Sequence, residues 1–268
     1  MVLEEKFTLS NGVEIPKLGF GTWLISNHHV KDAVVEAAKV GYRHIDTALA
    51  YHNESGVGEG IRASGVKREE MFVTSKVAAE IKDYKEAASS IDKSLRVLKF
   101  DYIDLMIIHS PKPWAEFHGR EHYFEGNREV WRAMEEGYNA GKLRAIGVSN
   151  FEKVDIENIL ASCSVKPMVN QILAHAGNIP QDLIAFSKAN NILVEAYSPI
   201  GHGKLLKNRK LAQVASRYNV SVSQLCIRFV LQLGLLPLPK TTNPSHMKND
   251  AEVDFVISEE DMQDLLSM

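Results

Sequence analysis

The sequence predicts a (β/α)8 barrel, an α/β fold in which eight parallel strands alternate with helices. Short apolar runs alternate with amphipathic, helix-length segments eight times along the chain. The apolar runs are continuous, which is typical of parallel strands that are buried on both faces. No linker rich in Pro, Ser or Gly divides the pattern, so we expect residues 1–268 to form one barrel domain.

The chain begins with a segment outside this repeating pattern. Lys6 to Lys17 alternates apolar and polar residues around Asn11-Gly12, a dipeptide that favours a type I′ turn. We therefore expect an N-terminal β-hairpin. The first barrel strand is expected at Leu18 to Trp23, where the glycines allow a close approach of the backbone.

The remaining elements follow in order along the chain. Strands are expected at the apolar runs Arg43–Asp46, Met71–Lys76, Tyr102–His109, Ala145–Ser149, Met168–Ile172, Leu193–Tyr197 and Leu235–Pro239. Helices are expected where apolar residues recur at helical spacing, at Val30–Val40, Ser55–Ala63, Asp83–Leu98, Asn127–Ala140, Val154–Cys163, Pro180–Asn190, Lys210–Tyr218, Val222–Leu233 and Pro244–Asp250.

An open, doubly wound sheet is the competing architecture. The glycines from Gly56 to Gly60 do not have the GxGxxG spacing of a dinucleotide-binding turn, and they fall inside an expected helix. We interpret them as a sign of close helix packing. The barrel is therefore the favoured fold.

Composition excludes several classes of protein. The chain has 268 residues, of which 45% are hydrophobic and 24% charged, which is enough to bury a large core. A net charge of -3 with interspersed signs does not favour nucleic acid or a membrane surface as a partner. Cys163 and Cys226 fall outside any CxxC pattern, so no disulfide framework or metal site is expected. With no signal peptide or membrane-spanning run, we expect a cytoplasmic monomer or weak dimer that acts on a small molecule.

Polar residues close most of the expected strands. They are Asp46, Lys76, His109, Ser149-Asn150, Asn170-Gln171, Tyr197 and Lys240. Each of them alone has an ordinary structural explanation. His109, for example, follows an apolar run, and such a histidine is more often a buried residue whose hydrogen bonds are made within the core. In a barrel, however, they would all meet at the C-terminal face, where active sites lie.

The stretch from Gly41 to Tyr51 is the most informative about chemistry. It places Asp46 and Tyr51 five residues apart at the end of a strand, although a helix cap and a packed phenol would look the same. The ordinary pKa of a phenol is about 10, and we expect Lys76 to lower it. Asp46 would hold Lys76, and His109 would orient a substrate oxygen. Such a set suits protonation of an oxygen that becomes negative when a carbonyl receives hydride, which implies a nicotinamide cofactor.

These residues lie in motifs that resemble the aldo-keto reductase superfamily over essentially the whole chain. The motifs are GFGTW at Gly19–Trp23, GYRHIDTALAY at Gly41–Tyr51, FVTSK at Phe72–Lys76, DYIDLMIIHSP at Asp101–Pro111, GKLRAIGVSNF at Gly141–Phe151, VNQ at Val169–Gln171, AYSPIG at Ala196–Gly201 and LPKTTNP at Leu238–Pro244. The resemblance implies a short, bacterial-type carbonyl reductase that uses NADPH, with NADH as a second possibility. It makes Tyr51 the proton donor, Asp46 and Lys76 its partners, and His109 the orienting histidine.

The resemblance also implies residues that hold the cofactor and the substrate. Ser149, Asn150 and Gln171 would bind the nicotinamide carboxamide, and Tyr197 would stack on its ring. The full expected cofactor set is Thr22, Trp23, Asp46, Ser149, Asn150, Gln171, Tyr197, Ser198, Ile200, Lys240, Thr241, Thr242, His246, Asn249 and Asp250. The expected substrate contacts are Trp23, Leu49, Tyr51, His52, His109 and Trp114.

The sequence departs from the family pattern at three places. His246 stands where arginine is common, so discrimination between NADPH and NADH is expected to be weaker. His52 replaces a common glycine, where it either contacts the substrate or only fills the rim, and Leu173–Ala176 replaces a common Glu-x-His-Pro run. Because the sequence ends at Met268, no long C-terminal loop is expected over the substrate pocket. The long connection from Ser110 to Gly126 is expected to act as a lid.

Two other functions fit the same barrel. A non-catalytic regulatory subunit would bind NADPH without turnover, but the complete set of catalytic residue types is evidence against it. An isomerase or aldolase for phosphosugars would need a glycine-rich phosphate cradle near the last strands, whereas Leu238-Pro239-Lys240 is not glycine-rich.

Overall fold

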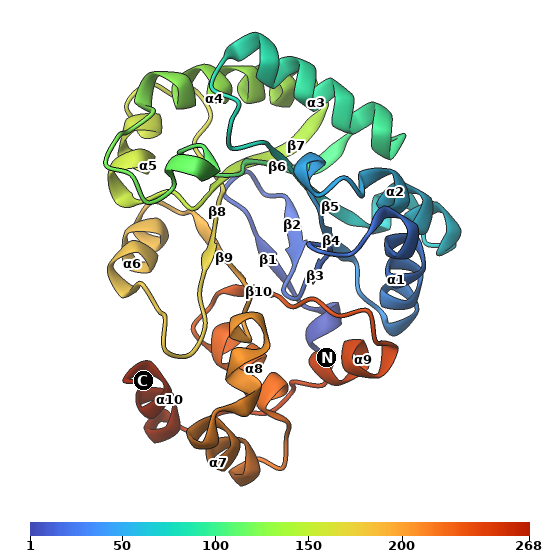
Figure 1. Ribbon diagram of the computed structural model, residues 1–268, viewed down its shortest axis with the longest axis vertical. Helices are drawn as coiled ribbons and strands as arrows, with labels where there is room; N and C mark the ends of the chain where they lie inside the picture. Colours follow the sequence, from blue (N-terminus) through green and yellow to red (C-terminus); the bar gives the residue numbers. More distant parts are fainter.

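Eight parallel strands form a single sheet that closes into a barrel (Figure 1). The computed structural model describes all residues, 1–268. In chain order, which is also their order around the sheet, the strands are β3 Phe20–Gly21, β4 His44–Asp46, β5 Phe72–Val77, β6 Ile103–Ile108, β7 Leu143–Ser149, β8 Val169–Leu173, β9 Leu193–Tyr197 and β10 Leu236–Leu238. The backbone amides of Gly19 and Gly21 donate to the carbonyls of Pro237 and Pro239, at 3.1 and 2.9 Å. These bonds join the first strand to the last, so the predicted barrel is confirmed.

Helices surround the barrel on its outside (Figure 1). They are α1 Asn27–Val40, α2 Glu54–Ala63, α3 Tyr84–Leu98, α4 Phe124–Asn139, α5 Lys153–Leu160, α6 Gln181–Ala189, α7 Arg209–Arg217, α8 Val222–Gln232, α9 Pro244–Ala251 and α10 Glu259–Leu266. Short 3-10 helices are η1 Val2–Glu4, η2 Leu49–Tyr51, η3 Arg68–Glu70, η4 Trp114–Glu116 and η5 Gly201–Lys207. None of the helices has both the length and the apolar composition needed to cross a bilayer.

Helix α4 begins three residues before the expected start at Asn127. The Asn127 side chain does not cap the helix. Its amide donates to the Pro111 carbonyl at 2.9 Å, and its oxygen accepts from Lys82 at 2.9 Å. The residue at which the helix was expected to begin therefore ties the helix to the loop before it.

The N-terminal hairpin consists of β1 Lys6–Thr8 and β2 Glu14–Pro16, which pair antiparallel as expected. The predicted type I′ turn is wrong, because only Gly12 has a left-handed backbone, with φ of 85°. The amide of Gly12 donates to the Leu9 carbonyl, and the amide of Leu9 donates to the Val13 carbonyl. This three-residue connection with glycine last is the next most common hairpin loop.

The hairpin closes the barrel at the N-terminal ends of its strands. Leu9 and Ile15 are buried and belong to one apolar cluster with inward-facing strand residues such as Leu105, Ile107 and Leu236. The barrel therefore has an apolar floor, and its only polar end is the opposite one, where the strands finish.

Alternate residues of each strand face inward and outward. In β5, Val73 and Val77 belong to the large core between the sheet and the helices, whereas Thr74 and Lys76 make hydrogen bonds across the barrel interior. The same alternation in β4 sends Ile45 outward and Asp46 inward. Strand register thus decides which polar residues enter the barrel.

The glycines of α2 allow close packing, as interpreted from the sequence. A Cβ at Gly56 would meet the Asn27 carbonyl of α1, and a Cβ at Gly58 would overlap the Leu98 carbonyl at the end of α3. Because backbone atoms cannot move aside as a flexible side chain can, the helix itself would have to shift. The run is therefore a packing feature rather than a nucleotide-binding turn.

We expect Gly58→Ala to lower the free energy of unfolding by about 1–3 kcal/mol, as in other overpacked cores. This loss occurs although alanine is intrinsically a better helix former than glycine by about 1 kcal/mol. Urea unfolding measures the effect, with Glu59→Ala at the exposed neighbouring position as the control. A Gly58→Ala protein as stable as that control would show that α2 and α3 are not in close contact here.

Candidate active site

A buried ion pair lies at the C-terminal end of the barrel interior. The Lys76 ammonium donates to Asp46 Oδ1 at 2.7 Å and to the Thr47 carbonyl at 2.8 Å. Both side chains are almost fully buried. Burial alone lowers the pKa of Lys76, but Asp46 and Tyr51 outweigh it, and the pKa is raised. Lys76 therefore remains charged in the closed interior.

Tyr51 and His109 lie directly beside this ion pair. Lys76 Nζ is 4.9 Å from the centre of the Tyr51 ring, and the rings of Tyr51 and His109 meet edge to face with their centres 5.6 Å apart. Burial, with a smaller contribution from Lys76, lowers the pKa of His109 to about 3. The imidazole is therefore neutral at physiological pH and can donate a hydrogen bond without giving up a proton. The structure thus brings together the four residues that the sequence singled out.

Lys76 acts on the pKa of Tyr51 in the expected direction, but it does not decide the net shift. We expected Lys76 to lower the pKa of Tyr51, but the pKa is raised, because burial of the phenol outweighs the ammonium and Asp46 adds to the rise. In this structure Tyr51 is therefore a protonated phenol at neutral pH.

Four residues expected at the nicotinamide are connected to one another. The Tyr197 hydroxyl donates to Asn150 Oδ1 at 2.8 Å, and Asn150 Nδ2 donates to Ser149 Oγ and to the His109 carbonyl, each at 3.1 Å. The Asn150 backbone amide donates to the Gln171 carbonyl at 2.9 Å. Burial raises the pKa of Tyr197 to about 12, so it too stays neutral. Strands β7, β8 and β9 thus present one hydrogen-bonded surface next to His109.

The other expected cofactor residues lie on loops and on α9 at the C-terminal end of the barrel, which we call the mouth. Lys240, Thr242 and His246 are exposed, while Thr22 is buried and donates to the Asp46 carbonyl at 2.9 Å. Ser198 Oγ lies 3.4 Å from His202 Nδ1 in the β9 loop. Two members of the set, Asp250 and Asn249, accept hydrogen bonds from α8 and its N-cap: Ser223 donates to Asp250, and Ser221 donates to Asn249. Ile200 and Thr241 are partly exposed.

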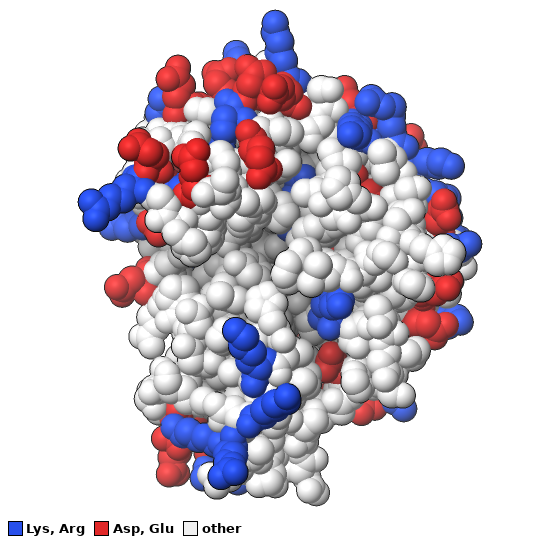
Figure 2. Space-filling view, in the orientation of Figure 1, with Lys and Arg blue, Asp and Glu red and all other residues white.

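Basic side chains lie along one side of this mouth. Figure 2 shows Lys and Arg side chains over η5 and the start of α7, below a hollow near the middle of the face. The sequence of these elements places Lys204, Lys207, Arg209 and Lys210 there. This side of the mouth suits an anionic ligand.

Aromatic side chains line the side of the mouth where the substrate contacts are expected. Trp114 in η4 meets His109 edge to face with ring centres 5.1 Å apart, and the residue is 42% exposed. Trp23 is 46% exposed and lies against His202, with ring centres 5.5 Å apart. His52 is exposed and Leu49 is partly exposed, both within or next to η2. Trp23, Leu49, His52 and Trp114 thus lie at the rim, and the loop from Ser110 places Trp114 against the buried His109.

Sequence reasoning missed a second layer of polar residues below this site. His44, Thr74 and Glu195 are fully buried inside the barrel. Each precedes an expected site residue by two positions, at Asp46, Lys76 and Tyr197, so strand alternation points both residues of each pair inward. This period-two spacing was the signal that could have revealed them.

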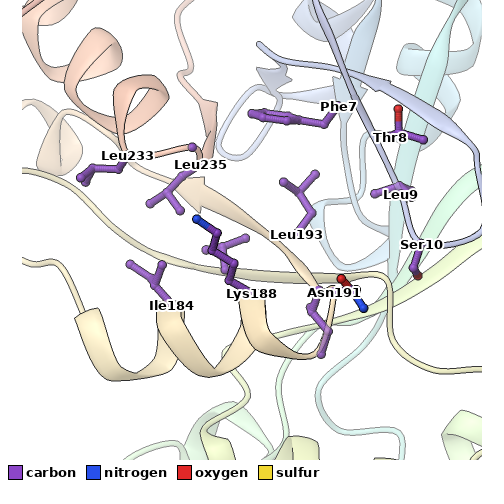
Figure 3. A pocket seen from close by; sticks show the side chains of 13 residues that line it. Phe7, Thr8, Leu9, Ser10, Ile184, Lys188, Asn191, Leu193, Leu233 and Leu235 are labelled. Carbon is purple, nitrogen blue, oxygen red and sulfur yellow. The ribbon is translucent and has the colours of Figure 1, made fainter.

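A separate cavity of about 570 Å³ lies at the other end of the barrel (Figure 3). It is lined by hairpin residues such as Phe7, by Leu193 at the start of β9, by Leu235 just before β10, and by Lys188 of α6. Lys188 is exposed, and no acid–base pair faces this space. The cavity therefore lacks the chemistry found at the mouth.

A parallel barrel with an ion pair, a phenol and an imidazole at the ends of its strands has the layout of a barrel enzyme. The chain belongs to the aldo/keto reductase family, because the model described as Aldo/keto reductase family matches residues 17–268. The resemblance found in the sequence is thus confirmed, and the protein is a reductase of that family.

Known relatives match nearly the whole chain. A glyoxal reductase of Bacillus subtilis is 42% identical over 262 residues, which cover 97% of this chain and 91% of the relative. The crystal structure of an aldo/keto reductase from Brucella melitensis has a TM-score of 0.90 and 35% identity, and the match covers 100% of this chain and 98% of the other. A Bombyx mori aldo-keto reductase, solved in complex with NADP, has a TM-score of 0.88 and 31% identity, with coverage of 98% and 92%.

Proposed function

We propose that the protein reduces aldehyde or ketone carbonyls to alcohols with NADPH, and that Tyr51 is the proton donor. The observation that supports this most directly is the position of the Tyr51 ring between Lys76 and the neutral imidazole of His109. A phenol that stays protonated at neutral pH has a proton to give, and the ammonium beside it stabilises the phenolate that forms.

Each residue has a distinct part in this proposal. When bound, the nicotinamide supplies the hydride for the carbonyl carbon. His109 donates a hydrogen bond that orients the carbonyl oxygen toward the Tyr51 hydroxyl. As negative charge develops on that oxygen, Tyr51 gives up its proton, and the Lys76–Asp46 pair compensates the charge left on the phenol.

The residues present fit a nicotinamide dinucleotide. Tyr197 offers a ring face beside the pair of Asn150 and Ser149, whose polar groups match a carboxamide. The exposed ammonium of Lys240 and the basic side chains over η5 offer charge to phosphates. The NADP complex of the Bombyx mori relative supports the same cofactor for this chain.

The substrate side favours small carbonyl compounds. Trp23, Trp114 and Leu49 supply apolar surface, while His52 adds a polar group at the rim. The name of the Bacillus subtilis relative supports including small 2-oxoaldehydes such as glyoxal among the candidates. The test is NADPH oxidation followed at a fixed wavelength over a panel of aldehydes, ketones and 2-oxoaldehydes. The absence of turnover across the panel, with NADPH still bound, would instead favour a regulatory subunit.

We expect His246→Arg to raise the preference for NADPH over NADH by about ten- to a hundredfold, because a charge-assisted hydrogen bond contributes about 1.5–3 kcal/mol. His246 is exposed on α9 at the rim, so the substitution should not disturb the fold. The measurement is kcat/KM for both cofactors with one carbonyl substrate. The kinetic constants for NADH should not change, and an equal gain with both cofactors would show that His246 does not contact the phosphate group that distinguishes NADPH from NADH.

A further inference from the structure

Glu195 is a fully buried carboxyl group at the centre of the barrel that the proposed mechanism does not use. Its side chain points inward from β9, two residues before Tyr197. Gln171 Nε2 donates to Glu195 Oε2 at 2.7 Å, while Oε1 has no hydrogen-bond partner. A buried carboxylate with a single donor is unusual, because burial of an unpaired charge is costly.

The same amide of Gln171 connects Glu195 to the active site. Gln171 Nε2 also donates to Asp46 Oδ2 at 2.9 Å, and Asp46 Oδ1 holds Lys76. A chain of contacts therefore runs from Glu195 through Gln171 and Asp46 to Lys76, which lies against Tyr51. Movement or ionisation of Glu195 acts on Asp46 through one shared amide group.

The charges around Glu195 allow only one of the two carboxyl groups to ionise at low cost. Lys76 is the single positive charge within this network, and Asp46 already pairs with it. His44 Nε2 is 4.0 Å from Glu195 Oε1, but burial and Lys76 lower the pKa of His44 to about 3, so the imidazole is neutral. An ionised Glu195 would leave the interior with one uncompensated negative charge.

We propose that Glu195 is a positioning residue for the proton-donating cluster and that it works as a neutral carboxylic acid. As a neutral acceptor it fixes Gln171, which in turn fixes the Asp46 carboxylate that holds Lys76. Ionised, it adds negative charge beside Asp46, which makes the Tyr51 phenolate harder to form. Burial first, and Asp46 second, raise the pKa of Glu195 to about 8, against smaller opposing effects of Gln171 and Lys76.

This inference rests on the proposed function, because it assigns a part in the proton transfer from Tyr51. The sign of the pH dependence follows directly. Below about pH 8 Glu195 is neutral and reduction proceeds at its full rate, and above that pH Glu195 ionises and the rate falls. Tyr51, whose pKa is raised, remains protonated in the range where this loss begins.

The test compares Glu195→Gln with the wild-type enzyme over a range of pH. Glutamine has the shape of the neutral acid and accepts from Gln171, but it cannot ionise. We expect kcat for carbonyl reduction at pH 6.5 to change less than about threefold, and the alkaline loss of kcat near pH 8 to move up by at least about one unit. Glu195→Leu removes the acceptor and should lower kcat about tenfold at every pH, as expected for an unsatisfied buried donor.

The matched control is Glu54→Gln. Glu54 is also buried with a raised pKa and one unpartnered oxygen, but it lies outside the barrel wall and accepts from Ser75. In this variant the loss of kcat at alkaline pH should occur at the same pH as in the wild-type enzyme. Superimposable pH profiles of wild type and Glu195→Gln, or full activity of Glu195→Leu, would overturn the proposal.

A spectroscopic readout separates this inference from the proposed function. Infrared difference spectra should show the carbonyl band of a protonated carboxylic acid that disappears near pH 8 in the wild type and is missing in Glu195→Gln. This band requires no turnover. If no aldehyde or ketone is reduced but the carboxylic acid band is present, the proposed function fails and the neutral state of Glu195 stands. If the band is absent while turnover is normal, only the inference on Glu195 fails.

Discussion

Replacing Tyr51 by Phe is expected to lower kcat for carbonyl reduction by about 10²–10⁴-fold, the usual contribution of a positioned general acid. Phenylalanine keeps the ring that meets His109 and lies beside Lys76, so only the hydroxyl is lost. His109 cannot take over the proton transfer, because its pKa of about 3 leaves it neutral, with no readily released proton. Steady-state oxidation of NADPH with the best carbonyl of the panel measures the loss.

The dissociation constant of NADPH, measured by quenching of tryptophan fluorescence, is the control for Tyr51→Phe. It should stay close to the wild-type value, since Tyr197, Asn150 and Ser149 are untouched. Turnover that survives in a preparation free of wild-type protein would show that another group, or water, donates the proton.

The second large effect is expected for Lys76→Met. Methionine has a similar volume but no charge, so Asp46 is left buried without its cation, and breaking such a pair typically costs about 3–5 kcal/mol in the free energy of unfolding. Without the ammonium the Tyr51 phenolate also loses its stabilising charge, and we expect kcat to fall by about 10²–10³-fold. Urea unfolding and steady-state kinetics measure the two losses.

A double variant separates the two consequences of losing Lys76. Adding Asp46→Asn to Lys76→Met removes the unpaired carboxylate, so most of the stability should return while activity stays low. Recovery of activity together with stability would mean that Lys76 acts only through folding. No recovery of stability would mean that the Asp46 carboxylate is held mainly by Gln171 rather than by the ammonium.

The barrel could be predicted from sequence because each local signal is strong and repeats. Continuous apolar runs such as Leu105–Ile108 in β6, bounded by amphipathic segments, allow few arrangements. Details that depend on tertiary contacts could not be predicted. The turn after Leu9 is longer than the Asn-Gly pair suggests, and Asn127 bonds to the loop instead of starting α4. That residues 1–268 form a single domain stays a prediction.

The candidate site was predictable to the extent that it lies at strand ends. Asp46, Lys76 and His109 all close apolar runs, and the barrel brings such positions to one face. The direction of the Tyr51 pKa shift was not predictable, because it depends on how burial compares with the nearby ammonium. The partners of Gln171 were also hidden, since Asp46 and Glu195 lie 125 and 24 residues away in the sequence.

The apolar floor made by the hairpin has a consequence for traffic through the enzyme. Because Leu9 and Ile15 fill one end of the barrel with apolar side chains, the polar interior opens to solvent at the opposite end. In the proposed reaction, the carbonyl substrate, the alcohol product and the dinucleotide all pass through that open end. The proton that returns to the Tyr51 phenolate after each cycle enters there as well. A molecule bound at the rim therefore delays both the release of product and the reprotonation of Tyr51.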